Sequence, residues 1–113
     1  MKIELLYFSD CPNYQGALKQ IEEVTRTANI AAEVELRDIR TEEDALRLRF
    51  LGSPTIRVNG VDIDPAARSS TDYGLKCRVY RQGNRLAGVP PRELVEQAIQ
   101  EARNGHDVRA ADR

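Results

Sequence analysis

The chain has 113 residues and 41% hydrophobic residues, which is the size of one domain that buries roughly two-thirds of its unfolded surface. Its net charge of −1 gives no indication of a nucleic-acid partner. Two cysteines are too few for a disulfide scaffold. Neither a signal peptide nor a membrane span is evident, so we expect a cytoplasmic monomer without a membrane partner.

A buried strand is predicted at residues 3–8, which read Ile-Glu-Leu-Leu-Tyr-Phe. Pro12 suits the first turn of a following helix, because its missing N–H costs nothing there. Cys11 is therefore expected at or next to the helix N-cap, where free N–H groups and the helix dipole favour an anion. Such positions lower a cysteine pKa to between about 3.5 and 7.5, which makes Cys11 a candidate nucleophile. The alternative is a small buried cysteine that fills space.

Helices and strands alternate through the rest of the chain. The spacing of apolar residues predicts a helix from Tyr14 to about Asn29. Five further elements are expected: a strand at 33–39, a short helix at 41–51, a β-hairpin at 55–63, an extended piece at 77–80 and a final helix at 91–103. The hairpin rests on Asn59-Gly60, which suits a tight turn between two short strands. Thr41 with Asp44 approximates a capping box at the start of the short helix, and Gly52 is expected to end it. A turn is expected at residues 82–84.

This order of elements predicts an α/β fold. A strand–helix–strand unit implies a parallel crossover, and the hairpin adds antiparallel strands to the same sheet. One domain is expected over residues 1–103, with a polar, disordered tail at 104–113. His106, the only histidine, lies in that tail and is given no catalytic or metal-binding role.

Three short motifs connect this order to a known family. Cys11-Pro12-Asn13 follows the first predicted strand, Gly-Ser-Pro-Thr at 52–55 precedes the third, and Cys-Arg-x-Tyr occupies 77–80. With these motifs, residues 1–103 resemble the thioredoxin superfamily, and in particular small, uncharacterised bacterial thioredoxin-like and glutaredoxin-like proteins. The resemblance implies a thioredoxin-like fold with a four-stranded mixed sheet in the spatial order 4-3-1-2. The first strand would be central, and helices would cover both faces.

The same resemblance assigns residues to a site. It implies that Cys11 is the nucleophile and that Pro54, preceded by the small Ser53, has a cis peptide bond and packs beside it. Ser-Pro alone does not predict this, since only about 5–6% of X–Pro bonds are cis. One departure matters: Tyr14 stands where a second cysteine would complete a dithiol loop, so that loop cannot form its own disulfide. Tyr14 is either a cap that donates its hydroxyl to a ligand or a core aromatic of the first helix.

Three chemistries remain for Cys11. In the first, a mixed disulfide with glutathione or a protein is resolved by an outside thiol. In the second, Cys77 is the resolving thiol, because the hairpin returns the chain toward the Cys11 end; otherwise Cys77 is a buried strand cysteine. In the third, both thiols hold a soft metal such as Cu(I) or Hg(II), since a structural zinc site takes four ligands.

The function predicted first is thiol–disulfide exchange by Cys11, with no bound cofactor and with glutathione as a candidate co-substrate. The alternative is a non-catalytic thioredoxin-fold module that binds a protein partner or a soft metal. The basic residues between 65 and 92 bear on this choice, because Asp72 alone opposes them. If they lie over Cys11, Lys76, Arg78 and Arg81 would favour the thiolate and attract anionic substrates. Arg78 is assigned to substrate binding on this basis, and the alternative is a solvated surface.

Overall fold

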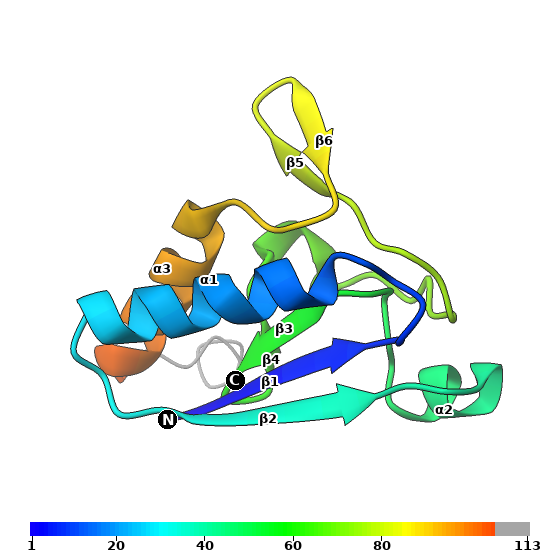
Figure 1. The fold of residues 1–113 in the computed structure, drawn as a ribbon, viewed down its shortest axis with the longest axis horizontal. Helices are drawn as coiled ribbons and strands as arrows, with labels where there is room; N and C mark the ends of the chain where they lie inside the picture. The colour runs from blue at the N-terminus through cyan, green and yellow to red at the C-terminus, as the bar shows by residue number, and fades with distance from the viewer. Residues whose placement is uncertain (106–113) are drawn as a thin grey trace.

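The main sheet of the protein has the predicted mixed topology (Figure 1). The computed structural model describes residues 1–105. Four strands lie in the order β2-β1-β3-β4, and their bounds are Lys2–Tyr7 for β1, Glu33–Asp38 for β2, Thr55–Val58 for β3 and Val61–Asp62 for β4. β1 pairs parallel to β2 and antiparallel to β3. The expected strand order and the interior position of the first strand are therefore confirmed.

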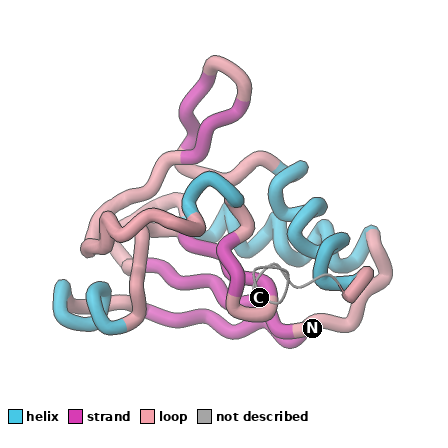
Figure 2. The backbone as a smooth tube through the Cα atoms, turned by 180° about the vertical axis from the view of Figure 1, so that it is seen from behind, coloured by secondary structure: helices cyan, strands magenta, loops and turns pink. Residues whose placement is uncertain are grey.

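Three α-helices accompany this sheet: α1 (Tyr14–Thr27), α2 (Glu42–Arg47) and α3 (Arg92–Arg103). Helices α1 and α3 pack together on one face (Figure 2), where they bury the inward side chains of β1 and β3. The larger members of this core are Ile3, Leu5, Ile21, Ile56, Ile63, Val95 and Ile99. The expectations for the tail beyond residue 105, including His106, lie outside the described residues.

Helix α2 occupies a different place. It lies at the end of the sheet, beyond β2 (Figure 1), where Ala45 packs with Leu6, Ile39 and Phe50. Leu6 points to the face opposite Leu5, because neighbouring residues of a strand alternate between faces. The second face of the sheet is thus covered by a helix only at this end, which is less than the helices on both faces that were expected.

The boundaries of α2 differ from the prediction at one end only. The Asp44 N–H donates to Thr41 Oγ1 at 3.0 Å, which confirms the predicted cap at the start of the helix. The helix ends at Arg47, before the expected position, and Arg49 supplies the left-handed residue that follows it with a φ of 55°. Gly52 is therefore not the residue that stops this helix.

A second hairpin follows the main sheet and was missed by the sequence analysis. β5 (Tyr80–Gln82) pairs antiparallel with β6 (Arg85–Ala87), and the two strands form an arm that projects from the body of the protein (Figure 1). We use "arm" for residues 80–87. The expected turn at 82–84 is correct, but the three residues of β6 are too few to show an alternating pattern.

Candidate functional site

Cys11 lies in the turn between β1 and α1, and its side chain is only 1% exposed. Its N–H donates to the Phe8 carbonyl at 3.0 Å. The thiol donates to the backbone carbonyl of Ser53 at 3.5 Å. Asn13 occupies the N-cap position of α1 without a side-chain cap, so Cys11 precedes the N-cap by two residues. The expected place at or next to the N-cap is thus displaced by one residue.

The loop at residues 52–55 forms the second wall of the site. The peptide bond between Ser53 and Pro54 is cis, as the resemblance implied. Ser53 is fully buried, and its hydroxyl has no hydrogen-bond partner among the described residues. Because a buried hydroxyl usually finds a partner, Ser53 Oγ is available to a group that arrives or ionises beside it.

Cys77 lies beside the same loop, although it is distant from that loop in the sequence. The Ser53 N–H donates to the Lys76 carbonyl at 2.8 Å, and the Arg78 N–H donates to the Ser53 carbonyl at 2.9 Å. These two bonds make a parallel bridge between Ser53 and Cys77. The carbonyl of Ser53 therefore accepts hydrogen bonds from both the Cys11 thiol and the backbone next to Cys77.

The Cys11 thiol affects the ionisation of Cys77. Cys77 is exposed, whereas Cys11 is buried. The pKa of Cys77 is raised, first by desolvation and then by hydrogen bonding to and repulsion from the Cys11 thiol. The structure thus brings together the two cysteines that the sequence analysis connected in two of its three alternatives.

Gly52 makes this close approach of the chain possible. Its φ is +118°, and a Cβ at this position would lie 3.0 Å from Arg78 Cβ and 3.2 Å from the Lys76 carbonyl oxygen. A side chain would therefore push residues 76–78 away from the loop. Glycine is required here both for the backbone conformation and for the contact.

Arg78 does not occupy the solvent-facing position that anion binding was expected to use. Its side chain is 7% exposed, and its guanidinium donates to both carboxylate oxygens of Asp62, at 2.8 and 3.0 Å. A third bond reaches Thr55 Oγ1 at 3.3 Å. Burial acts to lower the pKa of Arg78, but the hydrogen bond to Asp62 and the charges of Tyr80, Asp62 and Asp64 together outweigh it, and the pKa is raised. The side chain is an internal anchor, which corrects the expected substrate contact.

Tyr80 completes the anchoring of this segment. Its hydroxyl donates to the Pro54 carbonyl at 2.5 Å, and the Arg78 guanidinium carbon lies 4.4 Å from the centre of its ring. Burial raises the pKa of Tyr80, so the phenol stays protonated as a donor. We use "latch" for the cluster of five residues formed by Pro54, Thr55, Asp62, Arg78 and Tyr80. The latch holds Cys77 in place beside Ser53.

The comparison with known families adds one match. A family described as "Domain of unknown function (DUF2703)" matches residues 2–99. The chain belongs to this family. No curated protein and no solved structure matches it. The matched region contains both cysteines and the whole latch.

The residues of this DUF2703 chain limit other kinds of site. No group of three or more His, Cys, Asp or Glu side chains within residues 1–105 is arranged to hold a metal ion. Over the same residues, no helix has the length and apolar character needed to cross a membrane.

Tyr14 is not a fully buried core aromatic, and its proposed contact with a ligand stays a prediction. Its ring stacks on that of Tyr7, with centroids 4.3 Å apart and planes 15° apart, and the side chain is half-buried. The pair lies where β1 ends and α1 begins, next to the turn that carries Cys11. Sequence analysis had no signal for this pair, because Tyr7 was assigned to a buried strand.

Most of the basic residues between 65 and 92 form ion pairs, with acidic residues inside or outside that segment. Lys76 pairs with Asp72 at 2.7 Å, and Arg68 lies 3.8 Å from Glu101. Two arginines of the arm, Arg81 and Arg85, form no ion pair within the described part of the chain. The positive charge that the sequence suggested over Cys11 is therefore divided among several places.

Proposed function

We propose that this DUF2703 protein is a thioredoxin-like thiol–disulfide oxidoreductase whose redox pair is Cys11 and Cys77. One observation carries the proposal: both cysteines meet at the backbone of Ser53, one through its thiol and the other through its neighbours. The strand order of the sheet and the position of loop 52–55 beside Cys11 support the thioredoxin-like assignment. The latch supports it too, because it fixes the position of Cys77.

The proposed reaction is a two-electron exchange with an external disulfide. One protein thiolate attacks a sulfur of that disulfide, which forms a mixed disulfide and releases the first external thiolate. The other protein thiolate then attacks the protein-side sulfur, so that the bond between Cys11 and Cys77 forms and the second external thiolate leaves. The two protein thiols give up their protons to water. The protein is oxidised and the external disulfide is reduced by the same two electrons.

The difference in exposure assigns the order of attack in this proposal. Cys77 is exposed, so an external sulfur reaches it without movement of the chain, whereas Cys11 is 1% exposed. We therefore propose that Cys77 forms the mixed disulfide and Cys11 resolves it. Ser53 Oγ would donate to the Cys11 thiolate during that step. The order expected from sequence, with Cys11 attacking first, is the alternative.

Two variants, each of which replaces one cysteine by serine, test both the redox pair and the order in which the two thiols attack. Reduced wild type, Cys11→Ser and Cys77→Ser are each treated with oxidised glutathione and analysed by mass spectrometry. We expect wild type to form an intramolecular disulfide, and we expect glutathione to accumulate on Cys77 in Cys11→Ser. Accumulation on Cys11 in Cys77→Ser, with little on the other variant, would establish the alternative order. A glutathione adduct on wild type that never resolves, or intermolecular dimers alone, would contradict the pair.

The proximity of the two cysteines to the Ser53 backbone also favours a second candidate function. In this candidate the two thiolates bind a soft metal such as Cu(I) or Hg(II), which thiolates prefer. In that case reduced wild type would bind one metal ion per chain and both serine variants would lose it. Metal retained by either serine variant, or no metal bound by reduced wild type, would contradict this candidate.

A further inference from the structure

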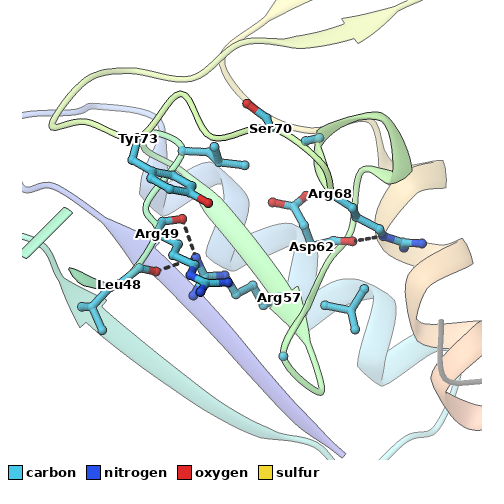
Figure 3. A pocket seen from close by; sticks show the side chains of 11 residues that line it. Leu48, Arg49, Arg57, Asp62, Arg68, Ser70 and Tyr73 are labelled. Atoms are coloured by element: carbon cyan, nitrogen blue, oxygen red, sulfur yellow. Dashed lines mark hydrogen bonds between the residues drawn. The ribbon is translucent and has the colours of Figure 1, made fainter. Parts of the chain in front are cut away.

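A pocket borders the latch at Asp62. Its volume is about 360 Å³, and it is enclosed by β3, β4, the segment after α2 and the loop at residues 67–73 (Figure 3). Asp62, which binds Arg78, forms part of its wall, but neither cysteine lines it. It is therefore separate from the thiol site and has no part in the function proposed above.

Three arginines, Arg49, Arg57 and Arg68, line this pocket. Arg57 is the best fixed, because its Nη2 donates to the carbonyls of Leu48 and Arg49, at 2.9 Å each. No carboxylate of the described residues lies within ion-pair distance of Arg57, and burial lowers its pKa. The result is a half-buried positive charge without a bonded anion.

The other two arginines add to the positive charge of the lining. Arg68 Nε donates to the backbone carbonyl of Asp62 at 2.9 Å, and its only ion pair within residues 1–105 is with Glu101, at 3.8 Å. The Arg68 guanidinium points away from Arg57 (Figure 3). Arg49 is exposed and forms no ion pair within residues 1–105. In Figure 3 the labelled side chains of Arg49 and Arg57 lie together below Tyr73.

The acidic residue of the pocket does not cancel this charge. Both carboxylate oxygens of Asp62 accept hydrogen bonds from Arg78, and one also accepts from the Asp64 N–H at 2.8 Å. The carboxylate is therefore already compensated by an arginine outside the pocket. The three lining arginines leave the pocket with an excess of positive charge.

The remaining lining is largely apolar. Tyr73, Leu48, Leu51 and Val61 contribute to it. The volume lies in the range of about 300–1,000 Å³ that is typical of sites for small organic ligands. An inorganic anion alone would leave most of this space and its apolar wall unused.

We propose that the pocket binds a small organic oxyanion, which is a carboxylate or phosphate group on an apolar or aromatic body. A guanidinium matches the geometry of such oxyanions and binds them through charge-assisted hydrogen bonds. Arg57 is held in place before the ligand arrives, so little side-chain freedom is lost on binding. Tyr73 and Leu48 contact the body of the ligand, while Arg49, which lies beside Arg57 in Figure 3, closes on the oxyanion.

Nuclear magnetic resonance titrations of the full chain test this proposal. The probes are benzoate and phenyl phosphate, with benzamide and phenol as their neutral counterparts and inorganic phosphate as a third anion. We expect saturable shifts at the amides of residues 67–73 and at least tenfold tighter binding of each anionic probe than of its neutral counterpart. Binding of inorganic phosphate as tight as that of phenyl phosphate would overturn the proposal. Carrying out the titrations with Cys11→Ser/Cys77→Ser keeps the result independent of the thiol chemistry.

A matched pair of variants separates a built site from a general charge effect. Arg49→Gln should weaken binding of phenyl phosphate about tenfold, the loss expected for one charge-assisted hydrogen bond. Arg81→Gln removes the same charge from the arm and should leave binding unchanged. Equal losses in the two variants, or anionic probes that bind no better than neutral ones, would overturn the proposal.

Discussion

Two arginines three positions apart, Arg78 in the latch and Arg81 in the arm, have opposite surroundings. Arg78 is almost fully buried and bound to Asp62 through two hydrogen bonds. Arg81 is exposed and has no ionic partner in the described part of the chain. The same amino acid in one short basic segment is therefore an internal anchor at one position and a solvated charge at the other. What decides between them is whether another element supplies a carboxylate.

The contrast extends to the neighbouring side chains. Tyr80 is 1% exposed, whereas Val79 and Leu86 are 60% and 65% exposed. A charged residue is thus buried and apolar ones are exposed within a few positions, which inverts the usual preference. The latch offsets the cost of burying Arg78 by satisfying its donors, and it leaves Cys77 and Val79 on the outer side of the segment.

The largest expected effect is on stability, when the buried ion pair is broken. Arg78→Met should lower the free energy of unfolding by about 3–5 kcal/mol, because Asp62 is left buried without its partner. Arg81→Met, the matched change on the arm, should alter it by no more than about 0.5 kcal/mol. Urea unfolding of the reduced proteins measures both. Similar losses in the two variants would mean that the latch contributes no more than an exposed side chain.

Glycines supply a second, smaller comparison between the two regions. Gly52 and Gly83 both have positive φ, but only Gly52 has atoms near the place of a Cβ. Gly52→Ala should cost about 2–4 kcal/mol, from backbone strain and from overpacking against Arg78. Gly83→Ala should cost about 1 kcal/mol, because strain acts there alone. Thermal unfolding gives both values, and a larger loss for Gly83→Ala would contradict the role given to Gly52.

Local patterns explain which parts of the fold could be predicted from the sequence. Asn59-Gly60 predicted the turn of the main hairpin, and these two residues have φ values of 51° and 83° in the observed turn. Thr41 predicted the start of α2. The extended piece at 77–80 was predicted, but hydropathy would place Val79 inside and Arg78 outside. Their true orientation depends on Asp62, which lies on another strand.

The candidate site was predictable in part for the same reason. Cys11 was identified as a candidate site residue from its place between a strand and a helix. Its burial was not predicted, because it results from packing that no local pattern reports. The convergence of Cys77 on Ser53 depends on a long loop whose path is set by contacts with the latch and by Gly52. The pair Tyr7 and Tyr14, likewise, becomes visible only when β1 and α1 are joined in space.

The smallest expected effect is a change in the pKa of Cys77. Hydrogen bonding to and repulsion from Cys11 contribute to raising it, so Cys11→Ser should bring the pKa back toward the ordinary cysteine value of about 8.5. The pH dependence of alkylation by neutral iodoacetamide measures this, because the thiolate is the reacting form. Leu86→Ala, a neutral change on the arm, should leave the pKa as in wild type.

The direction of this shift also predicts how the proton of Cys77 affects stability. A raised pKa means that the folded protein holds the proton more tightly than the unfolded chain does. The resulting stabilisation is complete below the ordinary pKa and is lost as the pH rises through the folded value. Stability should therefore fall less over this alkaline range in Cys77→Ser than in wild type, measured by urea unfolding at a series of pH values. An unchanged pKa of Cys77 in Cys11→Ser would mean that the two thiols do not interact, which would remove a main support for their acting as a pair.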